Sequence, residues 1–123
     1  MYRAGYLRSV EWFRRRDRWF SQEQDLHGEI HCVVCQKANP PREFELHHLD
    51  YSGVQKSGET WVAGEAHQDL VACHRRCHEW IHKLLDRDPA TADTGNRRTA
   101  NLQVIARLQA KIASQLEQWG GQE

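Results

Sequence analysis

The sequence predicts a small α+β domain that is held together by a metal ion, and three observations lead to this prediction. The chain has 123 residues, the size of one ordinary domain, and 28% of them are charged, which leaves little apolar material for a core. Two amphipathic helical patterns flank a middle region of short strand-like runs and turns. The cysteines form two close pairs far apart in the sequence, Cys32 with Cys35 and Cys73 with Cys77, which is a spacing typical of a metal site.

The first predicted element is a helix over residues 6–22. Apolar side chains recur there at helical spacing, as at Leu7, Val10 and Trp19. Ser9 is the candidate N-cap, because a serine hydroxyl accepts a hydrogen bond from the unpaired backbone N–H groups at a helix start.

Short strands and turns follow the helix. Residues 30–35, "IHCVVC", predict a strand that ends in a metal-binding turn, and the Asn-Pro-Pro at 39–41 predicts a turn because proline removes a backbone donor. Residues 44–51, "FELHHLDY", alternate in polarity and predict a second strand. Residues 52–68 contain three glycines and few apolar residues, so we expect a long loop there, and long loops in compact domains are often functional.

Two helices complete the chain. The first begins near Arg75, and its apolar side chains can pack against the strands. These side chains are Trp80, Ile81, Leu84 and Leu85. The second helix covers residues 98–119, and its predicted buried stripe consists of Leu102, Ile105, Leu108, Ile112 and Leu116. We therefore divide the chain into a domain of residues 1–88 and a helical extension of residues 89–123, which packs on that domain or on a partner.

Composition also suggests where the protein acts. The opening residues lack the apolar segment of a signal peptide, and no apolar run approaches transmembrane length. We therefore expect a cytoplasmic protein without a membrane partner, in a reducing compartment where paired cysteines usually hold zinc. The net charge is zero, so the overall electrostatic field gives no indication of a nucleic-acid partner.

The two cysteine pairs predict a structural zinc site with one ambiguity. Cys32 and Cys35 supply two ligands, and Cys77 at a predicted helix start supplies a third. The fourth ligand is either Cys73 or His74, because both spacings are chemically competent.

Four histidines predict a second metal site. His78 and His82 are four residues apart and lie on one face of a helix, while His47 and His48 are adjacent in a strand and point in different directions. Three imidazoles can bind a divalent ion and leave coordination positions open for water and substrate, which is the form of a catalytic site.

These segments resemble the HNH nuclease family, whose fold is the ββα-metal, treble-clef-like domain. The resemblance rests on "FELHH", which is similar to the same segment of the colicin DNases, on Asp69 nine residues before His78, and on "CHEWIH". The opening "YLRSVEW" and the two cysteine pairs resemble small zinc-bearing HNH proteins of bacteria and their phages. The resemblance covers about residues 6–85, and it rests on four elements in the family's order.

The resemblance implies a role for each residue. His47, His78 and His82 would hold a catalytic ion (Mg²⁺, Mn²⁺, Ni²⁺ or Zn²⁺), and His48 would be the general base that activates water. The resemblance therefore implies an enzyme, a metal-dependent DNA endonuclease or nickase that hydrolyses phosphodiester bonds. The ungapped register from Asp69 to His78 favours His74 over Cys73 as the fourth zinc ligand.

The sequence departs from the family at the middle position, where Asp69 replaces the usual asparagine. Asp69 would either orient His48 and raise its pKa, or serve only as a loop tether. The candidate contacts to DNA phosphates are four basic side chains: Arg14, Arg15, Arg75 and Arg76. The alternative to an enzyme is a catalytically silent, zinc-stabilised module that binds nucleic acid or protein. The C-terminal helix is a candidate surface for a homodimer or another protein partner.

Overall fold

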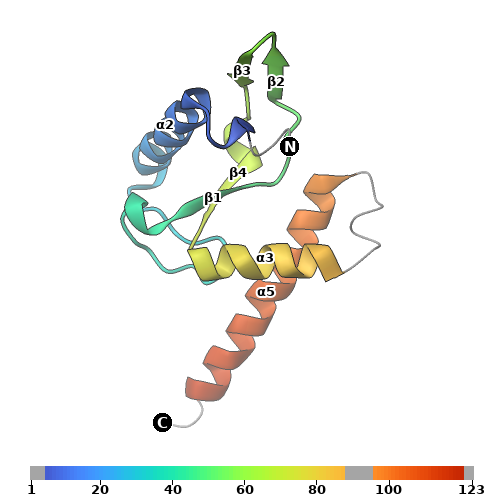
Figure 1. Cartoon of the computed structure of the whole chain (residues 1–123). Helices are drawn as coiled ribbons and strands as arrows, with labels where there is room; N and C mark the ends of the chain where they lie inside the picture. Colours follow the sequence, from blue (N-terminus) through green and yellow to red (C-terminus); the bar gives the residue numbers. More distant parts are fainter. Residues whose placement is uncertain (1–4, 88–95, 121–123) are drawn as a thin grey trace.

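The computed structural model describes residues 5–87 and 96–120, and the side chains as far as residue 115. The predicted domain boundary at residue 88 lies outside the described residues. The side chain of Leu116, a predicted core residue, lies outside the described side chains. Three long helices and two small antiparallel sheets make up an α+β fold (Figure 1).

The helices are α2 (Val10–His27), α3 (Arg75–Arg87) and α5 (Arg97–Gly120). One sheet pairs β1 (Glu45–His48) with β4 (Leu70–Cys73), and the other pairs β2 (Val54–Ser57) with β3 (Thr60–Ala63). Short 3-10 turns at Pro41–Glu43 and His67–Asp69 precede β1 and β4.

The N-terminal helix α2 begins at Val10, directly after the predicted N-cap Ser9 and four residues later than the predicted start at residue 6. The hydroxyl of Ser9 accepts a hydrogen bond from the backbone N–H of Trp12 at 3.2 Å, which confirms Ser9 as the N-cap. The helix continues beyond residue 22 to His27 and ends at Gly28, whose positive φ of 78° suits a residue without a side chain. Its inward face buries three aromatic side chains: Trp12, Trp19 and Phe20.

The sheet of β1 and β4 carries the histidine pair. His47 lies opposite Val71, and His48 lies opposite Leu70. Successive side chains in a strand point to opposite faces, so the two imidazoles enter different environments. Both faces of β1 are covered, and both histidines are buried.

A hairpin occupies most of the segment that the sequence predicts as a long loop. Residues 54–63 form β2 and β3, which are joined at Gly58 and Glu59. Gly58 has a φ of 63° at the first central position of this two-residue turn, as in a type II′ hairpin. The loop prediction was wrong because β2 exposes most of its side chains, so it lacks the strong apolar alternation that identifies a half-buried strand.

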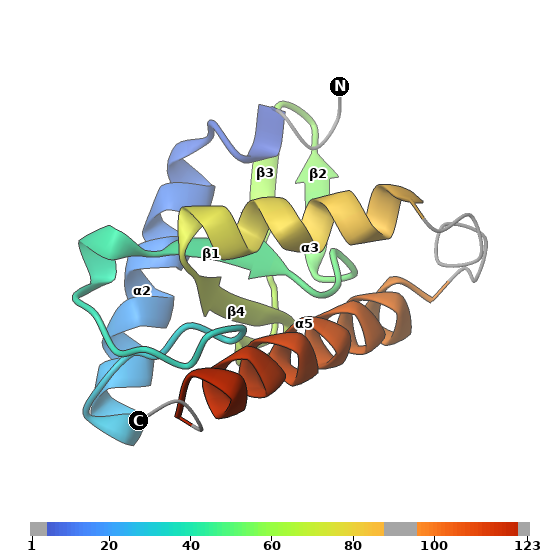
Figure 2. The same cartoon turned by 90° about the horizontal axis from the view of Figure 1, so that it is seen from below.

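Helix α5 packs against α3 and completes the same core (Figure 2). Ile105 and Leu108 are buried as the sequence predicts, and Ile112 is partly buried. Leu102, however, is 49% exposed, and Asn101 and Val104 are buried instead. The predicted stripe was therefore wrong at its N-terminal end, where the side chain of Asn101 turns inward one position before Leu102.

One hydrophobic cluster joins all of these elements. It includes Trp12 of α2, Leu46 of β1, Leu70 of β4, Ile81 of α3 and Val104 of α5. The described part of α5 therefore buries its apolar stripe on the rest of the chain. None of the helices in the described residues is long and apolar enough to cross a membrane.

Candidate metal centres

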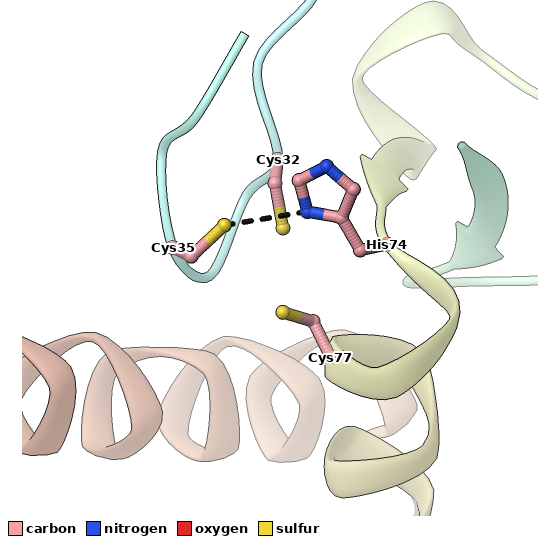
Figure 3. A group of neighbouring side chains, drawn as sticks. All are labelled: Cys32, Cys35, His74 and Cys77. Atoms are coloured by element: carbon pink, nitrogen blue, oxygen red, sulfur yellow. Dashed lines mark hydrogen bonds between the residues drawn. The ribbon is translucent and has the colours of Figure 1, made fainter. Parts of the chain in front are cut away.

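The first centre is a group of three cysteines and one histidine. Cys32, Cys35, His74 and Cys77 offer ligand atoms that all lie within 4.8 Å of one another (Figure 3). Cys32 and Cys35 lie on a tight turn, which is closed by the hydrogen bond from Gln36 N–H to the carbonyl of Cys32 at 2.9 Å. The two other ligands come from the junction of β4 with α3 and from the first turn of α3. This group could hold a metal ion such as zinc.

Hydrogen bonding directs His74 toward the sulfur atoms. Its Nε2 lies 2.7 Å from Oδ1 of Asn39, an oxygen that accepts, so Nε2 carries the proton. The lone pair is then on Nδ1, which lies 3.3 Å from Sγ of Cys35. A partner on the outer ring nitrogen is the usual way in which proteins orient a metal-binding histidine.

Cys73 lies outside this group. Its side chain is fully buried, and its thiol is 3.7 Å from the carbonyl oxygen of Glu45. Of the two alternatives for the fourth ligand, the structure brings His74 to the other three.

The electrostatics of the cysteine group favour a bound cation. Burial alone would raise the pKa of Cys32, but the backbone N–H groups of Cys35, His74 and Val34 point at its sulfur and lower the pKa overall. Burial and the neighbouring Cys32 raise the pKa of Cys77 to about 12. Several thiolates can coexist in this space only with a positive ion between them, so the donor set fits zinc.

The second centre consists of three imidazoles. Nδ1 of His47 lies 3.1 Å from Nε2 of His78, which in turn lies 3.1 Å from Nε2 of His82. His47 comes from β1, and the other two come from successive turns of α3. All three nitrogen atoms lie within 4.8 Å of one another, so the structure brings these predicted ligands together.

The outer hydrogen bonds place lone pairs toward the middle of this second centre. Nδ1 of His78 donates to the carboxylate of Glu45 at 2.9 Å, which leaves the lone pair of His78 on Nε2. Nε2 of His47 lies 2.5 Å from Oδ1 of Asn101, which leaves its lone pair on Nδ1. Burial lowers the pKa of His47 to about 3, so this ring stays neutral. Lone pairs that face each other at 3.1 Å repel, and a divalent cation between them removes the conflict, so the donor set fits such an ion.

His48 lies on the other face of β1 in a buried aromatic surrounding. Its ring stacks on Tyr51, with centroids 4.1 Å apart, and contacts Trp12 at 4.7 Å. Its Nε2 lies 2.7 Å from Oε2 of Glu65, and the hydroxyl of Tyr6 donates to the same oxygen at 2.7 Å. Burial would raise the pKa of Glu65, but these two hydrogen bonds outweigh it and lower the pKa overall. Glu65 is therefore a buried carboxylate that holds His48.

Asp69 makes the contacts of a loop tether. Its carboxylate pairs with Arg98, and its backbone carbonyl accepts a hydrogen bond from Leu49 N–H at 2.8 Å. Glu65, and not Asp69, is the carboxylate that contacts Nε2 of His48.

The four predicted DNA-contacting arginines divide into two groups. Arg14, Arg75 and Arg76 are exposed. Arg15 is only 3% exposed, and its guanidinium donates twice to the carbonyl oxygen of Glu65, at 3.2 and 3.0 Å. We therefore remove Arg15 from the candidate DNA contacts, because its side chain is buried and hydrogen-bonded in the interior.

The structure adds functional candidates that the sequence analysis did not name. Arg97 donates to the carbonyl of His48 at 3.3 Å and lies over the ring of Tyr51. Burial lowers the pKa values of His47 and His82, and the positive charge of Arg97 lowers them further, so a cationic side chain lies beside the imidazole group. Asn101 and Glu65 are the two other additions. Of these three residues, only Asn101 had a signal in the sequence, because it is a polar residue within an apolar helical stripe.

No protein-family model, curated protein or solved structure matches this chain.

Proposed function

We propose that this chain is a metal-dependent DNA endonuclease or nickase of the HNH type. The observation that carries the proposal is the convergence of three imidazole nitrogen atoms from His47, His78 and His82. A divalent ion held by three imidazoles keeps positions open and stabilises the negative charge that develops on a phosphate during hydrolysis. The cysteine group would hold a structural zinc ion close by, at the start of the same helix α3.

Residues around the imidazoles suit an anionic substrate. Arg97 supplies a positive charge next to His47 and His82, where it can bind a phosphate oxygen. His48 is the proposed general base. Because Glu65 is a carboxylate that accepts from Nε2 of His48, the lone pair of that ring is on Nδ1, and Nδ1 is the atom that would take a proton from water.

The burial of His48 favours a second candidate function. The residue is only 2% exposed, and a general base must come within hydrogen-bonding distance of its water. A module that holds metal ions and binds nucleic acid or protein without cutting would leave His48 as a structural partner of Glu65. The two candidates differ in whether any metal-dependent cleavage occurs.

A plasmid-nicking assay separates the two candidates. Zinc-loaded protein should convert supercoiled DNA to the open circle when Mg²⁺, Mn²⁺ or Ni²⁺ is added, and not when it is omitted. His48→Ala should lower the rate by about 10²–10⁴-fold while metal binding persists, because a general base contributes to the barrier and not to coordination. His78→Ala should lower metal affinity, with partial recovery at high metal concentration.

His27→Ala is the matched control, because His27 is exposed and pairs only with Glu23 among the contacts described for it. It should cut like the wild-type protein. If no ion supports cleavage, the silent module is the correct function. If His48→Ala cuts normally while His78→Ala is inactive, the enzyme stands and another group is the base.

A further inference from the structure

Helix α5 places one polar side chain among its buried apolar residues, and this side chain contacts the imidazole group. Asn101 is fully buried, between Ala100 and the core residues Val104 and Ile105. We propose that Asn101 is a positioning residue that fixes the proton of His47 on Nε2 and so presents the Nδ1 lone pair to the metal ion. This inference rests on the ion site of the proposed function and extends that site to a helix outside the segment that resembles the HNH family.

The orientation of the Asn101 amide follows from its own partners. Its Nδ2 lies 3.2 Å from the carbonyl oxygen of Leu49 and 3.0 Å from the carbonyl oxygen of Arg97. Carbonyl oxygens only accept hydrogen bonds, so the amide nitrogen must face both of them. The amide oxygen is then the atom that faces His47.

The fixed amide determines the tautomer of His47. An amide oxygen has no hydrogen to donate, so Nε2 of His47 must carry the proton that bonds to Oδ1 of Asn101. A neutral imidazole has one N–H, so Nδ1 keeps its lone pair and directs it at Nε2 of His78, 3.1 Å away. The opposite tautomer would direct an N–H bond at the ion and prevent coordination by His47.

The contacts of Asn101 also connect α5 to the end of β1. Leu49 follows the two histidines directly, so one amide holds both the His47 ring and the backbone just beyond β1. Such outer partners typically change metal affinity by about 10–100-fold when they are removed. The affinity of the imidazole group for an ion therefore depends on a residue 54 positions from His47.

Gln109 provides a matched control on the same helix. Its amide nitrogen donates to the carbonyl oxygen of Val33 at 2.7 Å, so it also attaches α5 to the rest of the chain through a side-chain amide. Val33 lies in the turn of the cysteine group and not at the imidazoles. Loss of Gln109 should therefore weaken the attachment of α5 without changing the tautomer of His47.

The test is a calorimetric titration of zinc-loaded protein with Ni²⁺, an ion that imidazoles bind well. Asn101→Leu, which has a similar volume and no acceptor, should bind Ni²⁺ about 10–100-fold more weakly than the wild-type protein. Gln109→Leu should bind with wild-type affinity. Asn101→Asp keeps an oxygen acceptor for Nε2 and should bind more tightly than Asn101→Leu. In the wild-type protein before Ni²⁺ is added, long-range ¹⁵N–¹H correlation spectra should show His47 with its proton on Nε2.

Each outcome decides the inference. A folded Asn101→Leu variant with wild-type Ni²⁺ affinity overturns it, as does a wild-type spectrum in which His47 carries its proton on Nδ1. The spectrum of the wild-type protein decides the matter if Asn101→Leu does not fold. A wild-type protein that binds no Ni²⁺ at the imidazoles also overturns it. If the wild-type protein binds Ni²⁺ through an Asn101-dependent site but cuts no DNA, the inference stands and the proposed nuclease function fails.

Discussion

His47 and His48 are neighbours in the sequence, yet they have different partners because β1 turns them to opposite faces. His47 contacts His78 and Asn101, whereas His48 contacts Glu65 and neighbouring aromatic rings. The different directions of the two rings could be predicted from the sequence, because side chains alternate along a strand. The partners Glu65 and Asn101 could not, because they come from a hairpin end and a helix face whose positions depend on long-range packing.

The buried carboxylate of Glu65 should make folding stability depend on pH. Its pKa is lowered from the ordinary 4.5, so its stabilising effect is present above about pH 4.5 and is lost as the pH falls through the folded-state value. Glu65→Gln should lower the free energy of unfolding at pH 6 by about 1.5–3 kcal/mol, because the carboxylate accepts two hydrogen bonds in the interior. The difference between variant and wild type should shrink between pH 5 and pH 3.

Urea unfolding of both proteins across that pH range measures this effect. Glu59→Gln is the matched control, because Glu59 is exposed at the hairpin turn and should behave as wild type at every pH. A difference between Glu65→Gln and wild type that stays constant from pH 6 to pH 3 would show that the charge of Glu65 does not contribute.

At the scale of elements, local signals predicted the helices better than the strands. Ser9 marked the start of α2, and apolar spacing located α3 and two of the buried residues of α5, Ile105 and Leu108. The β2–β3 hairpin was missed because β2 exposes most of its side chains, and because two backbone features of the hairpin leave no apolar pattern. One is the Gly58 turn, and the other is the close approach of Gly53 to Gly64.

The close approach of Gly53 to Gly64 predicts an intolerance to side chains. Gly64 N–H donates to the carbonyl oxygen of Gly53 at 2.9 Å, and a Cβ atom on Gly53 would lie 2.2 Å from the carbonyl oxygen of Gly64. Gly53→Ala should therefore lower the free energy of unfolding by about 1–3 kcal/mol or more, since the obstacle is backbone and cannot rotate away. The displaced hairpin should also disturb Glu65, the residue after Gly64.

Thermal unfolding compares this variant with Gly58→Asn. A Cβ atom at Gly58 meets open space, but the positive φ of a type II′ turn strains a residue with a side chain, so Gly58→Asn should lose some stability, though less than Gly53→Ala, whose Cβ atom meets backbone. Equal stability of Gly53→Ala and wild type would mean that the two backbone segments separate easily.

At the scale of the whole molecule, distant segments meet at a few buried polar groups and at the two candidate metal centres. Glu65 receives Tyr6 and Arg15 from the N-terminal region and His48 from β1. The cysteine group joins the turn of Cys32 to the start of α3. The sequence predicted the cysteine group well, because its two halves carry their own spacing. It placed α5 in an extension that packs on the domain or on a partner, because nothing in a local stripe shows which of these surfaces the stripe covers.

The last prediction concerns the cysteine group, whose ion should hold these segments together. His74→Ala should lower the zinc content of the purified protein well below one ion per chain and remove cooperative unfolding, because metal binding and folding are coupled in small zinc domains. Cys73→Ala is the matched control at the adjacent residue. It removes a buried thiol outside the ligand group, so it should cost some packing free energy and keep its zinc.

Zinc content and thermal unfolding, measured on both variants, distinguish the two residues. Loss of zinc from Cys73→Ala together with full retention in His74→Ala would exchange the two assignments. Folded, zinc-free protein in both cases would show that the core alone is sufficient to hold the turn of Cys32 against α3.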